Sequence, residues 1–210
     1  MVSIKTSNLR EASPQTSAKR AAIAKPMTYF DDQQYENLSQ LELGEYTECS
    51  FHTCSFPKAH LAGNRFIDCT FTDCDLSLAV VTDVSFQNTR FINCKLLGLQ
   101  FDGCQPLLLQ FHFDNCQIQH ASFVGLTIKG TNFINCQMEG SDFSKAKLDK
   151  CIFDNTELLN ATFENCSLRN TDFRTAIHFS INPEMNQMLG AKFSQNNLAG
   201  LLQKYRLNVE

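Results

Sequence analysis

Residues 131–175 read TNFIN CQMEG SDFSK AKLDK CIFDN TELLN ATFEN CSLRN TDFRT, which is nine consecutive groups of five residues. The third residue of every group is large and apolar, and Phe alternates there with Met or Leu. An amphipathic helix would repeat its apolar positions about every 3.6 residues and a strand every two, so a period of five predicts neither. The stretch therefore indicates a repeat architecture in which each unit packs against its neighbours.

The same period extends outward in two registers. The first register places a large apolar residue at every fifth position from Leu41 to Phe101. The second register runs from Leu108 to Phe173 and is displaced by two residues. We call these positions the centres of the groups.

The register break lies in FDGCQPLLLQF, residues 101–111. This segment adds two residues and contains Pro106, which has no N–H to donate to a strand ladder. Two extra residues are too few for a functional loop. We therefore expect a distorted corner, with a bulge or kink near residues 102–107.

Two positions before most centres the residue is small, and all ten cysteines occupy this position when the first register is run one step further. Alternate residues of an extended segment share one face, so the centre and the small residue can both point inward. We therefore interpret the cysteines as reduced core residues, not as disulfides, metal ligands or redox groups. Asn or Asp is frequent two positions after the centre.

Groups such as CTFTD, TNFIN and TDFRT resemble the consensus of the pentapeptide-repeat family: a small residue, a polar residue, Leu or Phe, and two variable residues. The resemblance covers about residues 38–176. It implies an all-β protein, a right-handed quadrilateral β-helix in which four five-residue sides close each of about seven coils. We expect residues 1–30 to form a basic, disordered segment, residues 31–176 the β-helix and residues 177–210 a C-terminal cap.

Residues twenty positions apart should lie above one another in such a coil. Coils stack at about 4.8 Å, so the Phe side chains of one face form a column that excludes water. Each buried side chain contributes about 1.5–3 kcal/mol, and the stack should dominate stability. The Phe and aliphatic alternation places Phe on two opposite faces in the second register. The predicted core stack is Phe51, Phe71, Phe91, Phe113, Phe133, Phe153 and Phe173.

The C-terminal segment has apolar residues at helical spacing, with Ser194 as an N-cap. We predict a short capping α-helix, because the last coil of a solenoid exposes apolar core and unpaired strand edges. A single apolar stripe would gain by pairing with its twin, and the resemblance to Qnr proteins likewise implies a homodimer through this helix. The residues expected at the cap or dimer contact are Leu198, Leu201, Leu202 and Tyr205.

The stretch INPEMNQMLGAKF, residues 181–193, is similar to the tail of the microcin B17 immunity protein, another member of the family. This resemblance favours the branch of the family that protects DNA gyrase.

The sequence offers no motif for catalysis. Its five His residues are scattered, none is spaced from a Cys or carboxylate as a triad or metal site requires, and no glycine-rich phosphate loop or nucleophile elbow occurs. We predict no catalytic residue, no metal site and no cofactor. No apolar run approaches the roughly 18 residues of a membrane span, and the first 30 residues lack a secretory signal, so we expect a cytoplasmic protein without membrane association.

Charge is the informative property of the surface. Residues 31–176 contain 19 acidic and 10 basic residues, a net charge of −9, and 11 of the acidic residues lie in residues 31–112 against 4 basic ones. The twenty-residue spacing should align several carboxylates in the first coils. The candidate acidic partner-binding face is Glu48, Asp68, Asp73 and Asp75.

The resemblance to Qnr proteins implies binding to DNA gyrase or topoisomerase IV by imitation of duplex DNA, with immunity or quinolone tolerance as the result. A dimeric rod near 70 Å would need about 40 charges to match a duplex, which carries one per roughly 1.7 Å, so two copies of −9 give a partial imitation. The alternative is a structural or protein-interaction scaffold with another partner. Neither hypothesis involves direct nucleic-acid binding.

Overall fold

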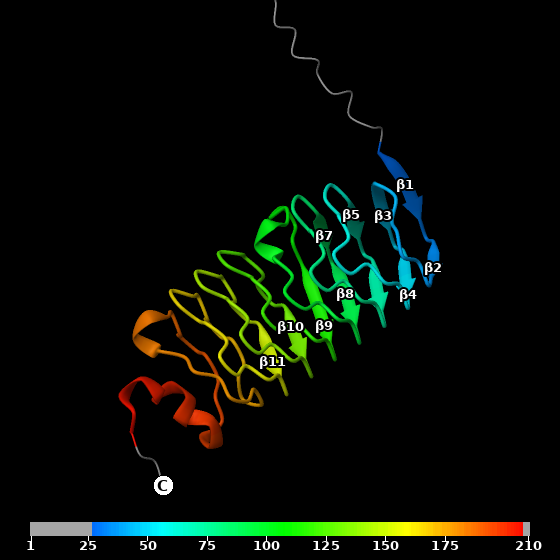
Figure 1. The fold of residues 1–210 in the computed structure, drawn as a ribbon. Helices are drawn as coiled ribbons and strands as arrows, with labels where there is room; N and C mark the ends of the chain where they lie inside the picture. Colours follow the sequence, from blue (N-terminus) through cyan, green and yellow to red (C-terminus); the bar gives the residue numbers. More distant parts are fainter. Residues whose placement is uncertain (1–26, 208–210) are drawn as a thin grey trace, which may run out of the picture.

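The computed structural model describes residues 27–207, so most of the predicted N-terminal segment lies outside the described range. The described chain is a rod of stacked coils with short strands, and helical turns occur at the register break and the C-terminal end (Figure 1). The strands are β1 (Thr28–Asp31), β2 (Gln34–Glu36), β3 (Gly44–Thr47), β4 (Ser50–His52), β5 (Arg65–Ile67), β6 (Thr70–Thr72), β7 (Ser85–Gln87), β8 (Thr89–Ile92), β9 (Phe111–Asp114), β10 (Asn132–Ile134) and β11 (Ile152–Asp154).

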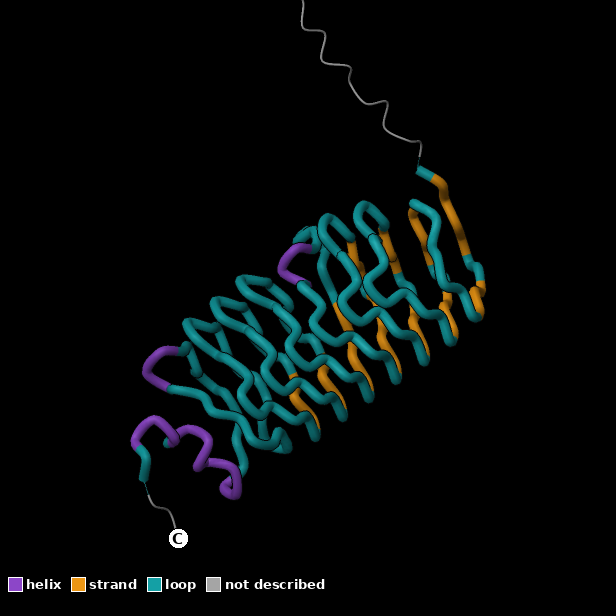
Figure 2. Tube along the Cα trace, in the orientation of Figure 1, coloured by secondary structure: helices purple, strands orange, loops and turns teal. Residues whose placement is uncertain are grey.

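All strand pairs are parallel and form two sheets. One sheet has the order β1-β3-β5-β7, and the other has the order β11-β10-β9-β8-β6-β4-β2. The seven strands of the second sheet are separated by six turns of chain, and bridges from Ile152 to Asp172 and from Asp172 to Lys192 continue the winding. Figure 2 shows the strands lined up along the rod, with loops and turns filling the other sides. The predicted parallel β-helix is confirmed.

The four sides of each coil form four faces, which we number by the order of their centres. The first face has centres Tyr46, Phe66, Phe86, Ile128, Leu148 and Leu168; the second Phe51, Phe71, Phe91, Phe113, Phe133, Phe153 and Phe173; the third Phe56, Leu76, Leu96, Ile118, Met138 and Leu158; and the fourth Leu61, Val81, Phe101, Phe123, Phe143 and Phe163. All of these side chains are buried.

Stacked rings fill the rod. Along the second face, consecutive centres from Phe51 to Phe173 are stacked with centroids 4.5–5.4 Å apart. Beyond Phe113, a second column on the fourth face meets the first edge-on, as between Phe123 and Phe133 at 5.8 Å. Phe therefore occupies opposite faces here, as the alternation predicts. Before the break, the partner column lies on the adjacent first face.

The corners between faces explain the preference for Asn and Asp. The residue two after the centre has a positive φ at many corners, for example 54° at Asp73, 55° at Asn93 and 52° at Asn115. Asn and Asp tolerate this left-handed conformation better than most residues. The Asn side chains also form a ladder between coils, because Asn93 Nδ2 donates to Asp73 and Asn115 Nδ2 donates to Asn93. The ladder satisfies polar groups along the edge of the rod.

The small residues point inward and hydrogen-bond the coil before them. Cys69 Sγ donates to the Tyr46 carbonyl at 3.2 Å, and Thr156 Oγ1 donates to the Phe133 carbonyl at 2.8 Å, both across 23 residues. All ten cysteines are buried, unpaired thiols. Cys, Ser and Thr therefore combine small volume with a donor for a buried carbonyl.

The register break is a local bulge. A 3-10 turn, η1 (Phe101–Gly103), precedes an exposed segment, while β8 and β9 stay paired across the two extra residues through Phe91 and Phe113. The prediction that Leu108 is a buried centre is wrong, because its side chain is 68% exposed and Leu109 is buried instead. The positive φ of Leu108, 57°, turns the chain so that Leu109 reaches the core.

The winding also continues beyond the predicted end of the β-helix at residue 176. The ring of Phe193 stacks on Phe173 at 5.3 Å, and a 3-10 turn, η2 (Pro183–Met185), interrupts the last coil. The expected α-helix is instead two 3-10 segments, η3 (Gln195–Leu201) and η4 (Gln203–Tyr205). So short an α-helix is marginal on its own, and contacts with the last coil determine this conformation.

Those contacts involve Asn197 and Gly200. Asn197 Oδ1 accepts from the Ser194 N–H, and its Nδ2 donates to the Phe173 carbonyl at 2.9 Å. Gly200 accepts from the Ile181 N–H, and a Cβ at Gly200 would lie 2.5 Å from the Phe179 carbonyl oxygen. The cap is therefore held close against the end of the core.

Candidate partner-binding surface

The four predicted acidic residues flank the second face of the N-terminal coils. Glu48 and Asp68 lie in successive coils at the corner between the first and second faces, as their partners in the ladder show. Asp73 lies at the opposite corner of the second face, and Asp75 begins the third face between Ser55 and Lys95. The structure therefore places these carboxylates along two edges of one face and not in a single stripe.

Neutral donors contact three of these carboxylates. Asn88 Nδ2 lies 2.6 Å from Asp68 Oδ1, Asn93 Nδ2 lies 3.1 Å from Asp73 Oδ1, and the Ser77 N–H donates to Asp75 Oδ1 at 2.9 Å. None of these donors carries a charge, so the negative charge of the edges is retained. The same bonds give the carboxylates a structural role at the corners.

The first face has a charge division that the sequence prediction missed. In the N-terminal coils its sides and corners carry six acidic residues and one basic residue, Arg65, for a net charge of −5. In the C-terminal coils they carry five basic residues and one acidic residue, Asp149, for a net charge of +4. The acidic residues are Asp31, Asp32, Glu45, Glu48, Asp68 and Asp83, and the basic residues are Lys129, Lys145, Lys147, Lys150 and Arg169. The twenty-residue spacing of these charges could have revealed the division.

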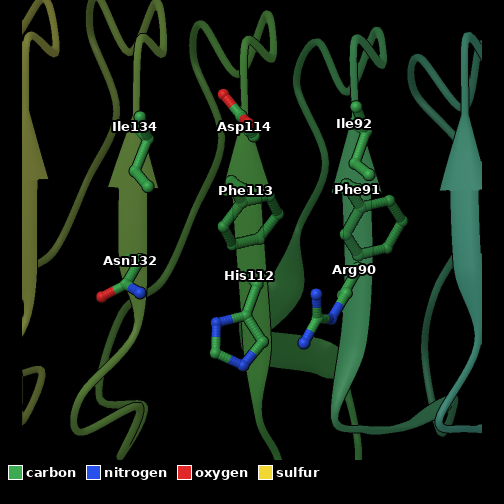
Figure 3. A pocket seen from close by; sticks show the side chains of 8 residues that line it. All are labelled: Arg90, Phe91, Ile92, His112, Phe113, Asp114, Asn132 and Ile134. Carbon is green, nitrogen blue, oxygen red and sulfur yellow. The ribbon is translucent and has the colours of Figure 1, made fainter.

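A shallow hollow of about 270 Å³ lies over β8, β9 and β10 on the second face (Figure 3). Arg90, His112 and Asn132 form one side of it, with Asp114 among the residues of the other side. Burial and the neighbouring Arg90 lower the pKa of His112, so its ring is neutral at pH 7. The hollow offers hydrogen-bond donors and acceptors to a ligand, and no cysteine or serine lines it for nucleophilic attack.

The buried cysteines are poorly suited to reactivity. Burial raises the pKa of Cys69 and of Cys151 to about 12, so both remain thiols at neutral pH. Within residues 27–207, no group of three or more His, Cys, Asp or Glu side chains is placed to hold a metal ion. No helix in this part of the chain is long and apolar enough to cross a membrane.

The predicted cap residues fall into two groups. Leu198, Leu202 and Tyr205 are exposed, with 43%, 38% and 51% of their surface accessible, whereas Leu201 packs against the core. Tyr205 Oη also donates to Glu184 at 2.8 Å, which ties η4 to η2. The three exposed side chains lie in η3, η4 and the residue between them, at the C-terminal end of the rod.

Known proteins share this repeat. The family profile described as pentapeptide repeat region matches residues 45–123, and the profile described as pentapeptide repeats (8 copies) matches residues 112–155 and 141–177. A quinolone resistance pentapeptide repeat protein, QnrB96 of Scandinavium goeteborgense, is 34% identical over 67 residues. That match covers 27% of this chain and 31% of the relative, so the chain spans about a third of that protein.

Two solved structures have low overall similarity. Full-length QnrB1, a plasmid-mediated fluoroquinolone resistance protein, is 16% identical with a TM-score of 0.35, over 86% of this chain and 100% of that chain. HetL of the cyanobacterium Nostoc, involved in heterocyst differentiation regulation, is 11% identical with a TM-score of 0.37, over 79% and 86% of the two chains. Together the profiles span residues 45–177, more than half of the chain, and the protein belongs to the pentapeptide-repeat family.

Proposed function

We propose that this protein is a non-catalytic binding protein that engages DNA gyrase or topoisomerase IV through the acidic edges of its second face, and thereby confers immunity or quinolone tolerance. The supporting observation is the placement of carboxylates on both edges of the second face, with Glu48 and Asp68 on one edge and Asp73 on the other. The similarity to a quinolone resistance protein supports the choice of partner. No cofactor is required, and the protein would act in the cytoplasm with its target.

The two edges place negative charge on both sides of the second face, as the two phosphate backbones do on a duplex. A five-residue side separates them, and Ser, Thr and His side chains of β4 and β6 lie between them. A basic groove that binds DNA would meet negative charge on both sides of a neutral strip. Complementary potentials of this kind raise association rates and select partners.

The number of carboxylates on the two edges limits how closely they can imitate the charge of duplex DNA. One edge can present at most one carboxylate per coil, or one per about 4.8 Å, whereas a duplex carries one charge per roughly 1.7 Å. Asn88 follows Asp68 on one edge, and on the other edge Asp73 is the one carboxylate in its column, between Thr53 and Asn93. We therefore expect binding that is weaker than DNA binding and that declines steeply as salt is raised.

The test is a gyrase supercoiling assay with a fluoroquinolone, comparing the native protein with the quadruple variant Glu48→Gln, Asp68→Asn, Asp73→Asn and Asp75→Asn. Asn tolerates the positive φ of Asp68 and Asp73, so the variant removes charge without disturbing the corners. Protection by the native protein and its loss in the variant are expected. The matched control is Glu139→Gln, Asp154→Asn, Glu157→Gln and Glu164→Gln, which removes four charges from later coils.

Equal protection by both variants would refute the role of the acidic edges in binding. If the native protein has no effect on DNA gyrase or topoisomerase IV, the proposal that one of these enzymes is the partner is refuted. The second outcome would favour a scaffold with another partner. One observation supports that alternative: the corner geometry already accounts for Asp68 and Asp73 without any partner.

Self-association through the C-terminal surface is a further part of the proposal. The exposed Leu198, Leu202 and Tyr205 would pair across a two-fold axis in a homodimer. The variant Leu202→Glu should shift the mass measured by light scattering from dimer to monomer. A native protein that is monomeric at high concentration would refute this contact.

A further inference from the structure

We propose that the first face of the C-terminal coils binds an oligophosphate, a small molecule that carries several phosphate groups. The site is a hollow of about 300 Å³ whose lining includes Lys129, Lys145, Lys147 and Arg169. It lies at the other end of the rod from the acidic edges and does not depend on the proposed topoisomerase partner.

The winding brings these cations together from three successive coils. Lys147 lies in a column with Thr127 and Ser167, and the residues two positions later form the neighbouring column of Lys129, Asp149 and Arg169. Lys145 precedes Lys147 at the corner, where φ is 62°. The two columns share one side of the rod, so a ligand on this side contacts several cations at once.

The single carboxylate of the hollow is already neutralised. Lys129 Nζ lies 3.0 Å from Asp149, the Ser167 hydroxyl hydrogen-bonds Asp149, and the backbone N–H of Arg169 donates to it at 3.3 Å. Burial opposes ionisation of Asp149, but these donors outweigh it and lower its pKa. A ligand therefore meets Lys145, Lys147 and Arg169, none of which has a salt bridge within the described part of the chain.

The donor set suits phosphate better than other anions. Arg169 Nη2 donates to Gln187 at 2.8 Å, and the other N–H groups of its guanidinium can donate to phosphate oxygens, while the two lysines add mobile point charges. Asn165 and Ser167 line the same hollow and supply neutral polar groups. No aromatic side chain lines it, so it lacks the stacking surface with which proteins hold nucleobases. The recognised group is therefore the phosphate chain.

The test uses sodium tripolyphosphate in isothermal titration calorimetry with the full chain at about 50 mM and about 150 mM salt. The native protein should bind one tripolyphosphate, with orthophosphate at least about tenfold weaker because it meets fewer cations. The variant Lys145→Gln, Lys147→Gln and Arg169→Gln should lose binding by about tenfold or more. The control Lys58→Gln, Lys95→Gln and Lys192→Gln removes three positive charges elsewhere and should bind as the native protein does.

Three outcomes would overturn the proposal. The first is the absence of measurable heat with the native protein at millimolar tripolyphosphate. The second is an equal loss of affinity in both triple variants, which would indicate a response to total charge. The third is tighter binding of a hexaglutamate peptide than of tripolyphosphate, which would assign the hollow to an acidic peptide. Circular dichroism of both variants confirms that any loss is not unfolding.

Discussion

The buried hydroxyl groups of Thr131 and Thr156 occupy equivalent positions in the repeat but have different partners. Thr156 Oγ1 donates to the Phe133 carbonyl, 23 residues earlier, at 2.8 Å. Thr131 is 1% exposed, and its Oγ1 finds no hydrogen-bond partner among the described residues. The residue 23 positions before Thr131 is Leu108, which the register break turns toward solvent. Replacing each Thr with Val, which has nearly the same shape, should therefore have opposite effects.

The magnitudes follow from the two environments. In Thr156→Val, loss of one buried hydrogen bond should reduce the free energy of unfolding by about 1 kcal/mol. In Thr131→Val, removal of a buried unsatisfied hydroxyl should increase it by about 1 kcal/mol, because such a group costs about 1–3 kcal/mol. The two variants should therefore differ by about 2 kcal/mol, or roughly 4–8 °C in melting temperature for a chain of this size.

The assay is urea unfolding followed by circular dichroism, with equal slopes required before the midpoints are compared. Thr171→Val should lose stability as Thr156→Val does, because Thr171 Oγ1 donates to the Leu148 carbonyl at 2.8 Å. A loss of stability in Thr131→Val as large as in Thr156→Val would refute the reasoning. It would mean that packing of the small residue, and not its hydrogen bond, determines stability here.

Three further predictions concern the thiols, the cap and the ring column. Burial raises the pKa of Cys69 and Cys151 from 9.0 to about 12, so above pH 9 the unfolded chain loses these protons before the folded chain does. The free energy of unfolding should therefore be constant below pH 9 and fall between pH 9 and pH 12, by up to about 1.4 kcal/mol per pH unit for each thiol. Denaturant titrations at a series of pH values measure this fall. Gly200→Ala should destabilise the cap by about 1–3 kcal/mol, because its Cβ would clash with the Phe179 carbonyl, and hydrogen exchange should show the loss in η3 but not in β4. Phe133→Ala should cost about 3–5 kcal/mol in thermal unfolding, and a cost below 1 kcal/mol would contradict the role of the stacked rings.

The repeat predicts most of the fold because each position of the five-residue group has the same environment in every coil. A large apolar side chain at every fifth position can be buried only if the chain turns a corner every five residues, and the small residue two positions earlier shares the same face. The Phe and aliphatic alternation after Phe113 even predicts which faces carry rings. The spacing of Glu48 and Asp68 likewise predicts that they occupy one corner in successive coils.

The parts that the repeat could not predict lie where it is broken. Between Phe101 and Phe111 three leucines follow one another, and periodicity cannot tell which of them reaches the core. At the C-terminus, helical spacing indicated an α-helix, but the contact between Gly200 and Phe179 depends on the end of the solenoid and favours 3-10 turns. Local propensity is weak compared with such tertiary contacts.

Some charged residues at the corners are favoured by the backbone conformation there, and others are not. A positive φ is readily accepted by Asn, Asp and Gly, so Asp68 and Asp73 satisfy the backbone whatever else they do. Glu48, Lys145 and Lys150 have φ values of 52°, 62° and 63°, although Glu and Lys gain nothing at such a corner. Replacing each with Asn should stabilise the protein by about 0.5–1 kcal/mol.

This gain in stability provides an independent test of both proposed surfaces. If Glu48 and Lys145 are present for binding, Glu48→Asn should weaken gyrase protection and Lys145→Asn should weaken tripolyphosphate binding, while both raise the melting temperature. Lys58→Asn, at a corner with φ of 58° but outside both surfaces, should give the same stabilisation with no loss of binding. A loss of binding in Lys58→Asn, or unchanged binding in the other two, would show that strain at a corner is no guide to function in this rod.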